Sequence, residues 1–127
     1  MVSTVYEDNF VTVTELQLFV RNYYMPSRKE RKVNLDQIVV LYFEEQEVSK
    51  LSTTRVWGRA IAPIYWALDL KRAFCRVPGL TKGRYNIVVD IGTDTKIGFS
   101  VTNIDSFMDH MRELLGYRVI IVNKINV

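Results

Sequence analysis

The chain has 127 residues, is 48% hydrophobic and 24% charged, and carries a net charge of +3, a composition typical of globular proteins that argues against extensive disorder. Its length suits one domain with one core, so residues 1–127 are expected to fold as a unit without disulfides or a structural metal. A single cysteine, no signal-peptide pattern and a most apolar stretch of only residues 60–68 predict a cytoplasmic protein that is not transmembrane.

Basic residues are concentrated in two segments of the chain. Residues 21–32 hold five basic side chains against one acidic one, and residues 71–84 hold five with no acid, while the remainder is net acidic. Such segments create a local positive field if they meet in space.

The first half of the sequence predicts a β-hairpin over residues 16–35. Apolar residues alternate with polar ones, as in half-buried strands, at Leu16, Leu18, Val20, Val33 and Leu35, and Pro26-Ser27 provides the turn. Residues 38–43 are apolar on both faces and predict the next strand, after which three glutamates are expected to return the chain to water: Glu44, Glu45 and Glu47.

The second half predicts another hairpin and a helix. Residues 85–91 and 97–101 alternate around the turn sequence Gly92-Thr93-Asp94. Helical spacing predicts a helix over about 104–115, with Thr102 and Asp105 as a capping box and Gly116 after its end. Its apolar stripe consists of Ile104, Phe107, Met108, Met111, Leu114 and Leu115.

Two segments are less regular. Residues 55–75 show neither the alternation of a strand nor the spacing of a helix, because Gly58 and Pro63 interrupt them. One or two short strands are expected there. Residues 117–122 are β-branched and aromatic and predict a final strand. Together the elements predict a mostly β (α+β) fold, a bent antiparallel sheet or open barrel of about seven strands capped by one C-terminal helix.

A family resemblance follows from three stretches in this order: "ELQLFVRNYYMPSRKERKVNLDQIVVLYF", "RVWGRAIAPIYWALD" and "YNIVVDIGTDTKIGFSVTNIDSFMDHMREL". They resemble the bacterial-type pleckstrin-homology-like (PH-like) domains, in which a first hairpin leads to a later strand that runs straight into a final helix. The resemblance covers about residues 6–115 and implies a binding or assembly module that is not an enzyme. Residues 117–127 are then a C-terminal extension, able to cover a strand edge or pair with another subunit.

Two groups of residues are candidates for binding. The basic hairpin could hold phosphate oxygens or an anionic lipid head group through Arg21, Arg28, Lys29, Arg31 and Lys32, although charges at a hairpin tip commonly serve solubility alone. Aromatic and β-branched residues are candidates for a protein interface: Trp57, Tyr65, Trp66, Tyr117, Val119 and Ile121.

Other functions find little in the sequence. Nucleic acid is not expected as a partner, because the acidic remainder would repel a polyanion. No catalytic residue is assigned, since Asp109 and His110 are helix neighbours that face different directions. Neither a metal nor a cofactor is expected, because no ligand motif occurs. The sequence therefore predicts a module for protein interaction or homo-oligomeric self-assembly, with anion or acidic-membrane binding through the basic hairpin as the alternative.

Overall fold

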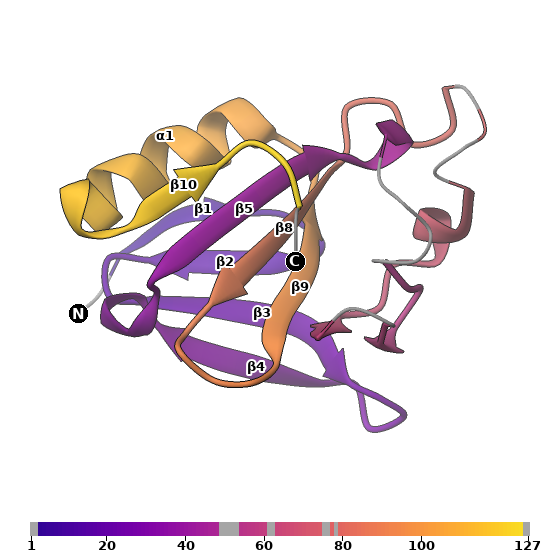
Figure 1. The fold of residues 1–127 in the computed structure, drawn as a ribbon, viewed down its shortest axis with the longest axis horizontal. Coiled ribbons are helices and arrows are strands. Elements are labelled where there is room, and N and C mark those ends of the chain that lie inside the picture. The colour runs from indigo at the N-terminus through magenta and orange to yellow at the C-terminus, as the bar shows by residue number, and fades with distance from the viewer. Residues whose placement is uncertain (1–2, 49–53, 61–62, 75–76, 78, 126–127) are drawn as a thin grey trace.

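The computed structural model describes residues 3–48, 54–60, 63–74, 77 and 79–125, and its first sheet is an antiparallel meander of four strands (Figure 1). In chain order these are β1 (Thr4–Glu7), β2 (Val11–Thr14), β3 (Gln17–Tyr24) and β4 (Lys29–Asn34). The predicted hairpin is confirmed as β3 and β4, which pair with Leu18 opposite Val33. Because apolar residues alternate along these strands, one face of the sheet is buried.

The second sheet has six strands in the order β10-β5-β8-β9-β7-β6. They are β5 (Val40–Glu45), β6 (Gly58–Arg59), β7 (Ile64–Trp66), β8 (Tyr85–Asp90), β9 (Lys96–Val101) and β10 (Ile120–Val122). Strand β10 is parallel to β5, and β7 is parallel to β9, whereas the other pairs are antiparallel. The predicted hairpin around Gly92 is therefore confirmed as β8 and β9, and the segment from 55 to 75 supplies two short strands as expected.

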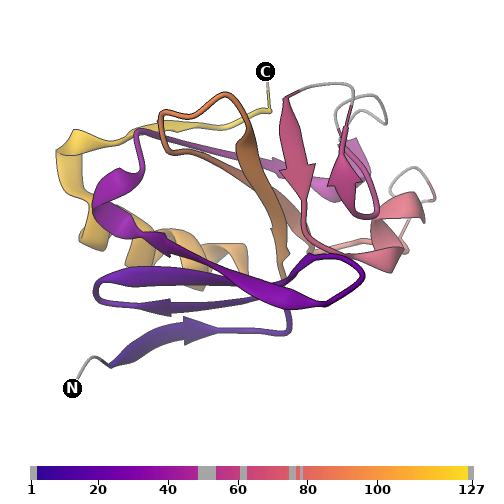
Figure 2. The same cartoon turned by 90° about the horizontal axis from the view of Figure 1, so that it is seen from below.

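Helix α1 (Ile104–Leu115) covers the space between the two sheets (Figure 2). Phe107, Met108, Met111 and Leu115 are buried in one core with residues from both sheets. The Phe107 ring lies edge-on to Tyr6 of β1 at 5.4 Å and to Phe99 of β9 at 6.1 Å, between ring centres. The predicted apolar stripe is thus the contact surface of the helix.

Short 3-10 turns connect the strands: η1 (Leu35–Gln37), η2 (Gln46–Val48), η3 (Leu70–Phe74) and η4 (Gly116–Arg118). Among the described helices, none is long and apolar enough to cross a bilayer.

The outer face of the six-stranded sheet carries a second, smaller core. Ala60, Ile64 and Trp66 pack there with Val88 and with Ile125 from the C-terminal tail. The tail therefore crosses the outside of the sheet after β10 (Figure 1).

Several local predictions need correction. The cap of α1 is Asn103, whose side chain accepts from the Ser106 amide, whereas Thr102 donates its amide to Asp8 at 3.0 Å. The final strand is only residues 120–122, because the chain continues from the helix as a 3-10 turn. Strand β5 begins at residue 40 and extends to 45, so Glu44 is only 8% exposed and does not return to water.

The strand number was underestimated as well. Strands β1 and β2 were not predicted, although Val11 and Val13 alternate with threonines in the way that a strand requires. The described residues form ten strands in two sheets and no closed barrel. Cys75 and Arg76 lie outside the described residues.

Candidate functional site

The five cations of the predicted anion site do not gather on one surface. Arg21 forms an ion pair with Glu7 of β1 and donates to the Asp8 carbonyl at 2.9 Å and to Thr12 Oγ1 at 2.7 Å. Its guanidinium is therefore occupied by the neighbouring strands of the first sheet.

The other four cations lie around the hairpin tip but point in different directions. Arg28 and Lys29 are exposed, and Arg28 Nε donates to Asn22 Oδ1 at 3.1 Å. Arg31 lies over the ring of the buried Tyr23, and Lys32 lies over Phe19. Since adjacent residues of a strand project to opposite faces, Arg31 and Lys32 cannot converge on one ligand.

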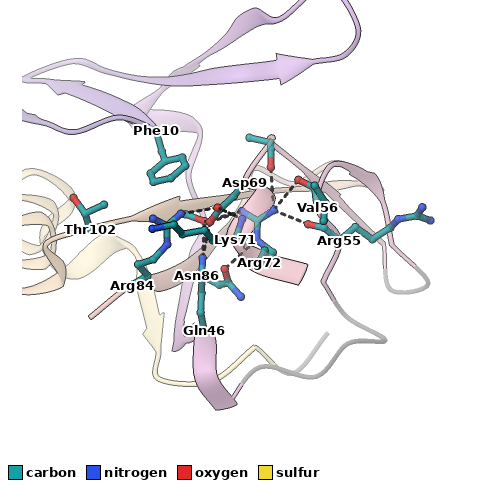
Figure 3. Close-up of polar contacts among 12 residues, drawn as sticks. Phe10, Gln46, Arg55, Val56, Asp69, Lys71, Arg72, Arg84, Asn86 and Thr102 are labelled. Carbon is teal, nitrogen blue, oxygen red and sulfur yellow. Dashed lines mark hydrogen bonds and ion pairs between the residues drawn. The ribbon is translucent and has the colours of Figure 1, made fainter. Parts of the chain in front are cut away.

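The two basic segments do meet, but much of the second one faces inward. The Leu68 amide donates to the Asn22 carbonyl at 3.0 Å, and the rings of Tyr23 and Tyr65 are 4.9 Å apart. Arg72 and Arg84, however, turn toward the buried carboxylate of Asp69 instead of toward solvent (Figure 3). The segment therefore contributes less surface charge than its composition suggests.

Asp69 is the centre of a buried polar network (Figure 3). Its Oδ1 accepts from Arg84 Nη2 at 2.5 Å, and its Oδ2 accepts from Gln46 Nε2 at 2.8 Å and from Ser100 Oγ at 2.6 Å. Burial raises the pKa of Asp69, but the hydrogen bond from Arg84, the charge of Arg72 and the other donors outweigh it and lower the pKa to about 2.

Arg72 links this network to the backbone around Arg55, Val56 and Ala67. Its side chain is 1% exposed, lies 4.5 Å from the Trp66 ring centre, and donates to Ser100 Oγ at 2.7 Å and to Asn86 Oδ1 at 3.2 Å. It also donates to three backbone carbonyls, those of Arg55, Val56 and Ala67. Arg72 therefore ties Arg55, Val56 and Ala67 to β8 and β9, and Asp69 at the centre of the network is only 2% exposed.

The predicted interface residues differ widely in exposure. Tyr117 is fully exposed and Trp57 is 49% exposed, whereas Trp66 is completely buried and Val119 is 7% exposed. Tyr65 and Ile121 are half-buried. Ile120, which was not singled out from the sequence, is 62% exposed.

One end of the molecule collects exposed apolar side chains around η4. These residues, here called the apolar end, belong to chain segments that meet at η4 through backbone bonds and Arg118: Leu16, Val39, Tyr117 and Ile120. The Ile120 amide donates to the Val39 carbonyl, and Leu16 borders a pocket of about 460 Å³ together with Leu114 and Arg118. A second pocket, of about 590 Å³, lies between the end of α1 and β10 and is lined by Arg112, Glu113, Gly116, Tyr117, Val119 and Ile121. In both views the turn at residue 16, η1 and the end of α1 lie at the same end (Figures 1 and 2).

Arg118 fixes the position of the apolar end. Its guanidinium donates to the carbonyls of Ile38 at 2.8 Å, Leu35 at 3.0 Å and Asp36 at 3.3 Å. These bonds hold η4 against the entry to β5, so β10 starts beside Val40.

Strand β10 forms an outer edge of its sheet. The N–H and C=O of one strand residue point the same way, and successive residues alternate. Since the Ile120 amide points to β5, the N–H and C=O of Ile121 point away from the sheet, where no described strand lies. The edge therefore offers a donor and an acceptor beside exposed apolar side chains.

The exposed features near η4 are apolar side chains and the backbone groups of Ile121. No three His, Cys, Asp or Glu side chains in the described ranges lie close enough to hold a metal ion. The sequence did not reveal the apolar end, because its members come from four separate turns or strand ends; only the unbroken apolar run Val119 to Val122 hinted at it. No protein-family model, curated protein or solved structure matches the chain.

Proposed function

We propose that this protein is a non-enzymatic PH-like module that acts in protein interaction or self-assembly through the edge of β10 and the apolar end. The observation that carries the proposal is that the uncharged β10 exposes Ile120 beside the outward N–H and C=O of Ile121. An extended segment of another chain can add to such an edge by backbone hydrogen bonds, while neighbouring pockets take its side chains.

The surroundings of this edge support the same function. Tyr117 is a large amphipathic side chain with no cover, and tyrosine is enriched at protein interfaces. The pockets on either side of η4 have volumes of about 460 and 590 Å³, enough to accept side chains of a partner. Arg118 holds this surface in place before any partner arrives, which lowers the entropic cost of binding.

The order of elements supports the PH-like assignment. A meander of four strands is followed by β5, β8 and β9, and β9 leads directly into α1. In this proposal, residues 46–84 between β5 and β8 and the residues after α1 are additions to the shared pattern. The tail additions supply the proposed contact surface.

The test compares two lysine substitutions of equally exposed residues. Ile120 is 62% exposed at the apolar end, and Leu70 is 66% exposed on η3, which lies at the opposite end of the molecule (Figure 1). Sedimentation velocity and affinity capture with identification of the retained protein are done on wild type, Ile120→Lys and Leu70→Lys. We expect wild type to form an assembly heavier than 14.8 kDa or to retain a specific protein. Ile120→Lys should lose this association and Leu70→Lys should keep it.

Two results would count against the proposal. In the first, wild type remains at 14.8 kDa at every concentration, and affinity capture recovers the same proteins with wild type as with Ile120→Lys. Alternatively, both lysine variants could lose association equally, which would separate it from the edge of β10.

The alternative function is binding of an anion or an acidic membrane by the hairpin tip. The observation that favours it is that Arg28, Lys29 and Lys32 are exposed at the tip and that none of them forms an ion pair with a described residue. Vesicles containing phosphoinositides or phosphatidylserine should then bind in a salt-sensitive way. Replacement of Arg28, Lys29, Arg31 and Lys32 by serine should abolish binding, and unchanged retention would dismiss the alternative.

A further inference from the structure

A row of three polar residues crosses the outer face of the six-stranded sheet, and the one on β5 has no hydrogen-bond or ion-pair partner among the described residues. Glu44 of β5 lies opposite Asn86 of β8, which in turn lies opposite Ser100 of β9. Ser100 and Asn86 belong to the buried network around Asp69 and Arg72. Glu44 is 8% exposed, and within the part of the chain that the structure describes its carboxylate makes neither a hydrogen bond nor an ion pair.

The carboxylate of Glu44 borders a pocket of about 470 Å³ at the end of β5. The pocket is lined by Glu44, Glu45, Val48, Tyr85, Asn123 and Lys124. The C-terminal tail forms one wall, held on the sheet by the buried Ile125. The carboxylate oxygens of Glu44 keep some contact with solvent, unlike the buried and unpartnered Gln46 Oε1 and Thr81 Oγ1. A small molecule in the pocket can therefore reach them.

The charges around the pocket favour a cationic ligand. Its lining includes the carboxylates of Glu44 and Glu45 and one basic side chain, Lys124, and Glu44 has no cationic partner among the described residues. A carboxylate that is largely removed from water without donors is costly, and N–H donors on a cation would relieve that cost. Tyr85 donates its hydroxyl to Glu45 at 3.0 Å, which holds the second carboxylate at the rim.

The available groups fit an ammonium group better than a metal ion. A divalent metal ion prefers a larger set of oxygen ligands, and the described residues contain no group of three acidic, histidine or cysteine side chains suited to one. Val48 and the Tyr85 ring can contact the carbon chain of an organic cation, and the Asn123 amide oxygen can accept a further N–H. We infer that the pocket at Glu44 binds the alkylammonium group of a primary amine. This site lies apart from the apolar end and does not depend on the proposed function.

Lys124 distinguishes the inference from a simpler structural explanation. It lines the same pocket but lies beyond 4.0 Å from the carboxylate of Glu44. If Lys124 served as the counter-ion of Glu44, its removal would destabilise the fold and weaken any site there. In a ligand site Lys124 repels the incoming ammonium group, so its removal should strengthen binding.

The test uses n-butylamine as the probe, at neutral pH and low salt, with amide chemical shifts and calorimetry as readouts. Saturable shifts at residues 44–48 and 123–124 are expected, and n-butanol, which has the same shape without charge, should not produce them. Glu44→Gln should weaken binding by about tenfold or more, as loss of a charged hydrogen-bonding partner does. Glu30→Gln, at an exposed glutamate of β4, should leave it unchanged.

Further variants keep the test decisive if Glu44→Gln fails to fold. Lys124→Met should bind n-butylamine more tightly than wild type, and Glu45→Gln should bind it more weakly. Nα-acetyl-lysine amide serves as a second probe. If it binds as tightly as n-butylamine, the natural ligand is a lysine side chain of a peptide or protein. If it does not bind, the natural ligand is a small free amine. Equal responses to butylamine and butanol, full binding by Glu44→Gln, weaker binding by Lys124→Met, or Ca²⁺ binding in place of the amine would overturn the inference.

Discussion

The indole ring of Trp66 lies directly over the backbone of Gly98, its neighbour on β9. A Cβ atom at position 98 would stand 2.5 Å from Trp66 Cε3 and 2.9 Å from Ile64 Cγ2. Both side chains are fully buried in the second core, so neither can move aside without opening that core. Glycine at this position lets the Trp66 ring of β7 pack against the backbone of β9.

Gly98→Ala should therefore destabilise the protein by about 3 kcal/mol, at the upper end of the range for overpacking a core. Gly92→Ala is the matched control, because Gly92 has a positive φ of 83° and open space above it. It should cost about 1 kcal/mol through backbone strain alone. Chemical denaturation measures both, and equal costs for the two variants would contradict the close packing of Trp66.

Asp69→Asn should reduce stability at neutral pH by about 3 kcal/mol, because it leaves Arg72 and Arg84 buried without their carboxylate. Asp94→Asn, at an exposed turn, should change stability little. Urea titrations at pH 7 check the difference.

The stability of wild type should also fall with acid in a way that depends on Asp69. The pKa of Asp69 is about 2 in the fold against 3.8 for an ordinary aspartate, so its ionised form favours the folded state. This contribution, about 2 kcal/mol, is fully present above about pH 4 and is lost as the pH falls through about 2. Asp69→Asn should lack this part of the acid dependence, and an unchanged acid profile would show that the network does not hold the pKa low.

Phe107→Ala should cost about 4 kcal/mol, since Phe107 is fully buried between Tyr6 and Phe99 and its loss leaves a cavity. Tyr117→Ala removes an equally large but fully exposed side chain two residues beyond the helix and should leave stability within about 0.5 kcal/mol. Thermal and urea unfolding distinguish the two, and a small effect of Phe107→Ala would mean that α1 does not close the core.

Arg118→Met should loosen β10 without unfolding the sheets. The three carbonyls of η1 and the start of β5 that Arg118 satisfies would lose their donors, at a cost of about 2 kcal/mol. Amide hydrogen exchange should become faster at Ile120, which bonds to β5, and stay unchanged at Val88 in the middle of the sheet. Uniform exchange across both strands would contradict the local role of Arg118.

Several regular elements could be predicted from the spacing of apolar residues in the sequence, although β1 and β2 were missed. Alternation in β3 and β4 and the stripe from Ile104 to Leu115 reflect burial against the main core. Strands β8 and β9 also alternate in sequence although both of their faces are buried, because polar Asn86 and Ser100 belong to the buried network on the outer face. The segment from 55 to 75 could not be predicted in this way. Its packing depends on long-range contacts of Trp66 with Gly98 and of Arg72 with Ser100, which leave no periodic pattern.

The candidate surfaces were harder to predict for a related reason. The sequence predicted exposed positive charge at Arg21, Arg72 and Arg84. Their acidic partners were not apparent, because Glu7 and Asp69 both lie outside the two basic segments. Tyr117 was named as an interface candidate and is fully exposed, whereas the choice of Val119 and Ile121 over Ile120 assumed a strand that began at residue 117. The 3-10 turn at the start of this segment shifted which side chains face water.

The central claim, that another chain pairs with the edge of β10, is tested most directly by hydrogen exchange at the Ile121 amide. In the dilute, isolated protein this amide points away from the sheet and should exchange rapidly, while the Ile120 amide is protected by Val39. In the assembly, or with the retained partner bound, Ile121 should become protected and Val88 should not change. Rapid exchange at Ile121 in both states would contradict strand addition at this edge.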